Sequence, residues 1–268
     1  MSESSSDGVR LRTVEFVSAG QRVRGDLVIP SGTGPHPGIV KYHGLPGSAD
    51  QVSGIATRLA QAGFVVLTFD FRGVRRSEGV FSLRGQIEDA RNSVSFLLDS
   101  ELCNGWVGVY GASFGGAVAI CSAARDSRVR AVAVRAPVYD TLRFAESGLL
   151  RVVMEEVSLY SAGQFRQADE RATIDSLSEA LLSDARVFNP IHDISDIAPR
   201  PLFVTTGTAD TLIDLNGVRS LFDLAGEPKR MFVVDGATHN LDDMTCRTET
   251  EEAIKEWFLE SVRCDCHT

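Results

Sequence analysis

The sequence has few of the features that mark membrane, secreted or nucleic-acid-binding proteins. No stretch approaches the roughly 18 consecutive apolar residues of a membrane-spanning helix, and the start, "MSESSSDGVR", has no apolar core of a secretory signal. The adjacent basic pairs, Arg75-Arg76 and Lys229-Arg230, are too short to form a patch, and the net charge is -9. Phosphate binding needs a concentrated positive surface. We therefore expect a cytoplasmic protein with neither a nucleic-acid nor a membrane partner.

Cysteine and histidine are also scarce, with five of each in 268 residues. An odd number of cysteines without a signal sequence favours reduced thiols. Cys264, Cys266 and His267 lie close together in the tail "CDCHT", where they form either a soft-metal site or a frayed terminus. A closed zinc site takes four ligands, and no GxGxxG motif is present. We expect neither a metal nor a cofactor.

What the sequence does contain is an alternation of strand and helix patterns over a 43% hydrophobic chain. "VRLRTVEFV" and "QRVRGDLVIP" alternate apolar and polar residues on either side of a turn, which predicts a β-hairpin. Continuous apolar runs such as "FVVLTFD" are typical of strands buried on both faces. Further strands are predicted at "GIVKYH", "WVGVYG", "VRAVAVRAP", "PLFVTTG" and "KRMFVVDG", with helices over residues 49–63, 84–100, 215–225 and 248–262. The alternation predicts one α/β domain over residues 1–268, with a mostly parallel sheet covered on both faces.

Residues 138–190 interrupt this alternation, because they contain no convincing strand. Their apolar residues are spaced as in several short helices. We expect a helical cap inserted over the carboxyl ends of the strands, with Phe144 and Met154 as candidate substrate-binding residues.

The stretch "GVYGASFGGAVAI" places Ser113 among small residues between a predicted strand and a predicted helix. This is the setting of a nucleophile elbow, in which a sharp turn exposes the serine hydroxyl at the end of the sheet. The alternative is a glycine-rich turn whose serine only caps the following helix.

A nucleophilic serine needs a histidine base that is oriented by a carboxylate. His239 and Asp210 each follow a predicted strand, and the order Ser113, Asp210, His239 is the one expected for this arrangement. Asp214 is a second candidate for the acid, but its position at the start of a predicted helix favours an N-cap.

The oxyanion of an acyl-transfer reaction needs two backbone N–H donors. Candidates are Phe114, directly after the serine, and Leu45, in "KYHGLPGS" after an early strand. For His43 in the same stretch we favour a buried structural role.

Together, "HG" at residues 43–44, "DFRGVRRSEG", "GASFGG", "GTADTLID" and "GATHN" resemble the α/β-hydrolase superfamily over nearly the whole chain. The sequence is similar to small microbial carboxylesterases of the cinnamoyl (feruloyl) esterase type, and to the catalytic domains of prolyl-oligopeptidase-type hydrolases. The short hairpin and the helical insertion fit the esterases better. The resemblance implies an α/β-hydrolase fold and a serine hydrolase that acts on carboxylic esters.

One position departs from that resemblance. Arg75 stands where such families usually have the second glycine of D-x-R-G-x-G-x-S, so Arg75 either faces the substrate or is a solvated or salt-bridged arginine. Three functions remain open: an esterase for short or aromatic acyl groups, a peptidase-like amidase, and a non-catalytic binding protein. A homo-oligomer is a further expectation that the sequence does not decide.

Overall fold

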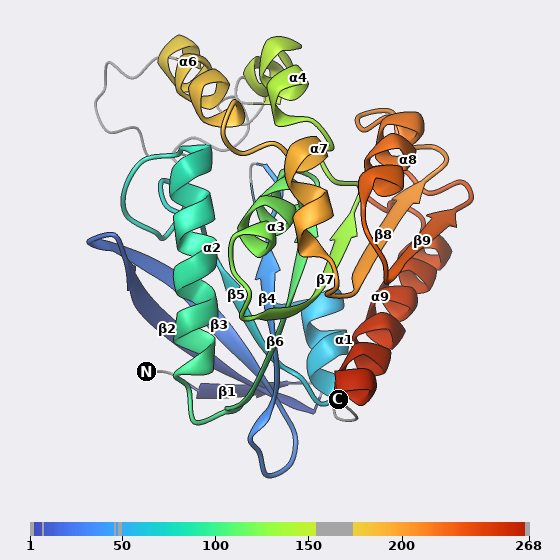
Figure 1. Cartoon of the computed structure of the whole chain (residues 1–268). Helices are drawn as coiled ribbons and strands as arrows, with labels where there is room; N and C mark the ends of the chain where they lie inside the picture. Colours follow the sequence, from blue (N-terminus) through green and yellow to red (C-terminus); the bar gives the residue numbers. More distant parts are fainter. Residues whose placement is uncertain (1–2, 7, 46, 48–49, 154–173, 266–268) are drawn as a thin grey trace.

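The fold is built on one mixed β-sheet (Figure 1). The computed structural model describes residues 3–6, 8–45, 47, 50–153 and 174–265. Within them the sheet has nine strands, in the order β1-β2-β3-β5-β4-β6-β7-β8-β9. Their bounds are β1 Glu3–Ser6, β2 Val9–Ser18, β3 Gln21–Pro30, β4 His36–Tyr42, β5 Val65–Phe69, β6 Cys103–Ala112, β7 Val129–Arg135, β8 Leu202–Gly207 and β9 Lys229–Val234.

The sheet is antiparallel at its amino-terminal edge and parallel elsewhere. β1, β2, β3 and β5 pair antiparallel, whereas the neighbours from β5 to β9 in the sheet order pair parallel. The predicted hairpin is confirmed: Ser18 pairs with Gln21, and Ala19 and Gly20 both have positive φ. Two such residues form the tight turn whose twist matches that of the flanking strands.

Helices cover both faces of the sheet, which confirms the predicted fold class. α2 (Leu83–Leu98), α3 (Phe114–Ala124) and α8 (Leu215–Leu224) pack on one face, and α1 (Ile55–Gln61) and α9 (Met244–Asp265) on the other (Figure 1). Every residue of β5 is buried, as expected for a strand covered on both sides. Each face has its own apolar core.

The regular structure in the described part of residues 138–190 is helical, with turns and irregular residues between the helices. α4 (Thr141–Glu146) and α6 (Ile174–Ala185) lie beyond the carboxyl ends of the parallel strands (Figure 1), and α7 (Pro190–Asp193) returns the chain to the body through the short 3₁₀ helix η1 (Ile194–Ile197). Residues 154–173, including Met154, lie outside the described residues. The expectation that residues 138–190 form a cap over the active site stays a prediction.

The helix predicted over residues 49–63 is shorter than expected. Asp50 accepts hydrogen bonds from the backbone N–H groups of Val52 and Ser53, and Gly54 has a positive φ. A local turn of this kind competes with helix formation. α1 therefore begins at Ile55.

A buried ion pair anchors the loop after β5 to α2. The carboxylate of Asp89, which is fully buried, accepts hydrogen bonds from the backbone N–H of Arg72 (2.8 Å) and from its Nη2 (2.6 Å) and Nε (3.0 Å). Glu88, next to Asp89 and about half exposed, touches only Arg72 Nη2, at 3.3 Å.

Asp89→Ala is expected to lower the free energy of unfolding by about 3–5 kcal/mol, because it removes the buried carboxylate that binds the largely buried Arg72 guanidinium. Glu88→Ala is the matched control, with an expected cost of about 0–1 kcal/mol. Urea denaturation of the three proteins measures both values. Equal costs for the two variants would contradict the role given to the buried pair.

Candidate active site

Ser113 lies in a strained turn between β6 and α3. Its φ is 54°, in the left-handed region that non-glycine residues rarely adopt. A Cβ on Gly111 would lie 2.1 Å from the carbonyl oxygen of Gly115, and a Cβ on Gly115 would lie 2.4 Å from that of His43. The glycines are therefore required because the backbone of this turn packs against itself and against the loop after β4.

The backbone of Ser113 is held, but its side chain is not used for capping. The N–H of Ser113 donates to the Arg135 carbonyl (2.9 Å), and its carbonyl accepts from the N–H groups of Gly116 (2.9 Å) and Val138 (3.0 Å). Although Ser113 occupies the N-cap position of α3, its hydroxyl makes no capping hydrogen bond. The alternative that the serine only caps the helix is therefore not supported.

His239 and Asp210 meet across the loops that follow β9 and β8. The Nδ1 atom of His239 lies 2.8 Å from Oδ2 of Asp210, and the side chains are 12% and 1% exposed. The other carboxylate oxygen, Oδ1, accepts from the N–H groups of Leu212 and Ile213, both at 2.9 Å. Asp214 instead caps α8 by accepting from Gly217 N–H, so the carboxylate beside His239 belongs to Asp210.

The pKa of Asp210 lies below its ordinary value. Burial raises this pKa, but the hydrogen bond from His239 and those from the backbone N–H groups of Ile213 and Leu212 outweigh burial. Hydrogen bonds to the charged form of a carboxyl group favour ionisation. The carboxylate is therefore ionised at neutral pH, as an orienting partner of a histidine requires.

The loop after β4 lies directly against Ser113. A Cβ on Gly44 would be 3.0 Å from Cβ of Ser113, so the N–H of Leu45 follows immediately beyond the nucleophile turn. Within the described part of the chain, neither Leu45 N–H nor Phe114 N–H has an acceptor. The two candidate oxyanion donors thus come from two elements that touch at Ser113.

His43 fixes this loop rather than facing the reaction centre. Its Nε2 accepts from Phe71 N–H (3.1 Å), and its Nδ1 lies 2.7 Å from the Gly44 carbonyl oxygen. This pattern needs a neutral ring with the proton on Nδ1. Burial lowers the pKa of His43, which is consistent with the structural role expected from the sequence.

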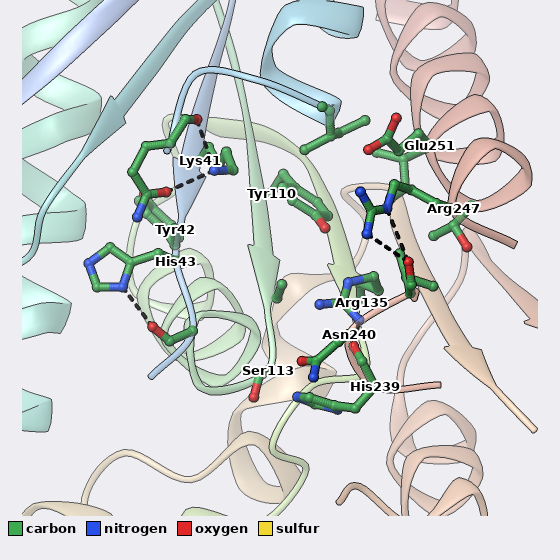
Figure 2. Close-up of a pocket in the computed structure, with 18 of the residues that line it drawn as sticks. Lys41, Tyr42, His43, Tyr110, Ser113, Arg135, His239, Asn240, Arg247 and Glu251 are labelled. Carbon is green, nitrogen blue, oxygen red and sulfur yellow. Dashed lines mark hydrogen bonds between the residues drawn. The ribbon is translucent and has the colours of Figure 1, made fainter. Parts of the chain in front are cut away.

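Ser113, His239 and Leu45 line one pocket of about 460 Å³ (Figure 2). The described contacts do not include a hydrogen bond between the Ser113 hydroxyl and the His239 ring. Catalytic hydrogen bonds are often long in unliganded enzymes. The structure thus places Ser113 and His239 in one pocket, and the hydrogen bond between His239 and Asp210 is formed.

One wall of this pocket is charged, which was not predicted from the sequence. It is formed by Lys41, Arg135, Arg247 and Glu251 (Figure 2). The sequence does show Lys41 and Arg135 as charged residues at or near the end of largely apolar strands. A strand pattern does not say which face a charged side chain meets, and α9 supplies the other two residues from far along the chain.

A second pocket, of about 370 Å³, lies between α4 and the loop after β8. Phe144 lines it, and the Phe144 ring packs against that of Phe114, with 5.7 Å between centroids. Leu212 and Ile213, just after Asp210, form the facing wall. Phe144 is therefore placed near the nucleophile turn; Met154 lies outside the described residues.

Arg75 lines neither of the two pockets described. Its Nε lies 4.0 Å from Oδ1 of the buried Asp70. The other oxygen of Asp70, Oδ2, accepts a hydrogen bond from Arg76 Nε at 2.7 Å. The φ of Arg75 is 46°, so an arginine adopts here the conformation for which a glycine is usual. The structure thus favours the salt-bridged interpretation of Arg75 over a substrate contact.

None of the described helices has the length and apolarity needed to cross a bilayer. Among the described residues, no group of three or more histidine, cysteine or acidic side chains is arranged to hold a metal ion. Cys266 and His267 of the tail lie outside the residues that the structure describes.

Asp210→Asn is expected to lower the free energy of unfolding by about 1–3 kcal/mol near pH 6, the range for a hydrogen bond to a charged group. Because the pKa of Asp210 is lowered in the folded state, its contribution is present above the unfolded pKa near 4 and is lost as the pH falls through the folded pKa. The stability difference between the two proteins should therefore shrink below about pH 4.

Urea denaturation from pH 6 to pH 3 measures this difference. Asp223→Asn, on α8, controls for the loss of one negative charge. A difference that is constant or grows toward pH 3 would contradict the assigned hydrogen bond.

Comparison with known proteins places this geometry in a family. The family model described as X-Pro dipeptidyl-peptidase (S15 family) matches residues 19–239. The YfhR protein of Escherichia coli (strain K12) is 27% identical, over 85% of this chain and 72% of that protein. The polyketide transferase ATR5 of Stachybotrys chlorohalonatus (strain IBT 40285) is 26% identical, over 89% of this chain and 91% of that protein.

Solved structures show the same fold. Est1E from Butyrivibrio proteoclasticus, with ferulic acid bound, superposes with a TM-score of 0.77 at 17% identity, over 93% of this chain and 99% of that chain. Given this fold and the family match, the chain belongs to the X-Pro dipeptidyl-peptidase (S15) family and is an enzyme of the α/β-hydrolase class.

Proposed function

We propose that the protein is a serine hydrolase in which Ser113 is the nucleophile, His239 the general base and Asp210 the residue that orients the base. The observation that carries this proposal is the 2.8 Å contact of His239 Nδ1 with the buried Asp210 carboxylate, in the same pocket as a serine whose hydroxyl caps nothing. A carboxylate on Nδ1 leaves Nε2 free to accept the serine proton.

The reaction would proceed through an acyl-enzyme. His239 accepts the Ser113 proton as the hydroxyl oxygen attacks the substrate carbonyl, and the resulting oxyanion receives hydrogen bonds from Leu45 N–H and Phe114 N–H. His239 then donates the proton to the leaving group. Water repeats the sequence to release the acid and regenerate Ser113.

Carboxylic esters of short or aromatic acyl groups are the proposed substrates. The pocket beside Phe144 is lined largely by apolar side chains and is small, which suits a short chain or one ring better than a long acyl chain. Among the structural neighbours, Est1E was solved with ferulic acid, an aromatic acid, bound. This likeness supports the proposal by analogy of fold alone.

An X-Pro dipeptidyl-peptidase activity is the second candidate, since it is the description of the matching family. Such an enzyme must bind a free peptide amine, which calls for an unneutralised carboxylate near the nucleophile. Glu251, on the pocket wall, already accepts from Arg58 Nε at 3.0 Å. This contact favours the esterase over the peptidase.

Three broader expectations accompany the proposal. The mechanism needs neither a metal nor a cofactor. A cytoplasmic location, with no nucleic-acid or membrane partner, stays a prediction, as does self-association. A non-catalytic binding protein on this scaffold is the competing interpretation, which the first experiment below excludes or supports.

Ser113→Ala is expected to lower kcat by about 10³-fold or more on a nitrophenyl ester and to abolish labelling by a fluorophosphonate, because the triad acts as a unit. The matched control is Ser122→Ala, on the same helix, whose hydroxyl bonds to the Ala119 carbonyl. Near-complete activity in purified Ser113→Ala would refute the assignment. Comparing nitrophenyl esters with aminoacyl-prolyl anilides separates the esterase from the peptidase.

Phe144→Ala is expected to change the ranking of acyl groups, because its ring forms both the wall of the second pocket and a contact with Phe114. We expect kcat/KM for an aromatic ester to fall about tenfold relative to acetate, in line with the loss of a buried ring contact. Phe96→Ala, which removes a ring stacked on Phe16, controls for destabilisation. If Phe144→Ala changes kcat/KM by the same factor for all esters, the second pocket does not select the acyl group.

A further inference from the structure

The pocket beside Ser113 brings together three cationic side chains from three separate elements. Lys41 comes from β4, Arg135 from the end of β7, and Arg247 from the first turns of α9 (Figure 2). Triad chemistry needs none of these charges. Because charged side chains are rarely placed in a half-buried cavity unless paired, their presence calls for an explanation.

Lys41 is satisfied by neutral groups. Its Nζ donates to the backbone carbonyl of Gln51 (3.0 Å) and to the side-chain oxygen of Gln51 (2.8 Å). Burial lowers the pKa of Lys41 to about 8, so the ammonium is still mostly protonated at neutral pH. The charges of Asp50, Asp70 and Glu251 offset part of this lowering.

The two arginines likewise bind neutral carbonyl groups. Arg135 Nη1 donates to the His239 carbonyl at 2.5 Å, and Arg247 donates to the Leu241 carbonyl from Nε (3.0 Å) and Nη2 (2.9 Å). A guanidinium has five N–H donors. These hydrogen bonds go to carbonyl groups rather than carboxylates, and they leave each arginine with further N–H groups next to the catalytic loop.

Glu251, the carboxylate on this wall, acts on Lys41 but is shared with another arginine. Arg58, which is outside the pocket wall, donates to Glu251 from Nε at 3.0 Å. This ion pair offsets the negative charge of Glu251 from outside the pocket. Lys41, Arg135 and Arg247 therefore leave the pocket with an excess of positive charge.

Tyr110 adds a neutral donor to the same wall. Its side chain is 4% exposed, and its hydroxyl points toward Arg135 (Figure 2). Burial raises the pKa of the Tyr110 phenol, so the hydroxyl stays protonated. Beside the Glu251 carboxylate, the wall thus combines two guanidinium groups, an ammonium and a phenol, all of which can donate hydrogen bonds.

We propose that this pocket binds a carboxylate carried by the substrate, so that the enzyme selects esters that retain one free acid group. The inference rests on the proposed function, because Ser113 and His239 line the same cavity. Arginine matches a carboxylate geometrically, with paired N–H groups facing paired oxygens. A cavity of about 460 Å³ holds a small acid but not a polymer.

The same charges disfavour an amine. An ammonium group in this pocket would meet three cations and one carboxylate that is already paired with Arg58. Like charges in a cavity of low polarisability repel strongly. The pocket is therefore expected to favour an acidic substrate and to disfavour a peptide amine.

Selectivity is tested with two matched pairs of esters. In the acyl half, the mono-nitrophenyl ester of adipate is compared with its carbamoyl analogue; in the alcohol half, acetoxybenzoate is compared with acetoxybenzamide. We expect kcat/KM to be at least about tenfold higher for the acid than for the neutral analogue in one of the two pairs, because a buried charged hydrogen bond contributes at this level. The pair that shows the preference identifies the half of the substrate that enters the pocket.

Variants assign the preference to the pocket. Lys41→Met and Arg247→Gln should each lower the acid-to-neutral ratio about tenfold, whatever they do to the absolute rates. Arg10→Gln, which removes an exposed arginine at the start of β2, should leave the ratio unchanged. Circular dichroism of each variant establishes that it is folded, and either pocket variant suffices if the other does not fold.

A binding measurement separates this inference from the proposed catalysis. Calorimetry of Ser113→Ala with adipate should show binding that weakens about tenfold or more in Ser113→Ala/Arg247→Gln, even if the wild-type protein hydrolyses no ester. Labelling of Ser113 without acid selectivity and without adipate binding would overturn the inference while leaving the serine hydrolase in place. A preference for an ammonium-bearing ester would also overturn it.

Discussion

Close backbone contact at the nucleophile turn is the constraint on which the rest of the site depends. The carbonyl of Gly115 and the Cα of Gly111 are too close for a side chain between them, and the carbonyl of His43 touches Gly115 from the loop after β4. The ends of β4 and β6 and the start of α3 therefore meet without side chains between their backbones. This contact lifts Ser113 out of the sheet and at the same time fixes where Leu45 lies.

The glycines of "GASFGG" are thus explained by geometry rather than by flexibility. A strand-to-helix turn with an exposed serine needs a positive φ at the serine, a strain of order 1–3 kcal/mol. The hydrogen bonds from Ser113 N–H to the Arg135 carbonyl and from Val138 N–H to the Ser113 carbonyl hold it in place. These contacts with β7 and the residues after it hold Ser113 in its strained conformation, so the turn is already in place before substrate binds.

Much of the fold and the central residues of the site were predictable because each signal is local. Apolar runs predicted the parallel strands, and Ser113, Asp210 and His239 were each recognisable as a residue just beyond a strand. Asp210 could be preferred over Asp214 because a helix N-cap and a strand-end turn have different local patterns. The structure places both aspartates as those patterns indicate.

What could not be predicted depends on contacts between distant parts of the chain. Whether Arg75 faces substrate or Asp70 is decided by a fold contact, not by its motif. The pairing of Arg58 with Glu251 joins residues 193 positions apart, and it offsets the charge of the carboxylate on the pocket wall. The start of α1 at Ile55 depends on a turn made by Asp50, which competes with a helical pattern that the sequence also supports.

The arginines of the pocket couple its charge to the position of the catalytic base. Arg135 holds the carbonyl of His239, and Arg247 holds that of Leu241 two residues later, so the loop that carries the base rests on the same groups that make the pocket positive. The whole chain carries a net charge of -9, which at a distance repels an anion, although salt screens this repulsion beyond about 10 Å. Attraction arises only inside the cavity, where the dielectric screening is weaker. Under the proposed chemistry, Arg135 and Arg247 would therefore have two roles. Their guanidinium groups attract the acidic substrate into the cavity, and their hydrogen bonds hold the loop that positions His239.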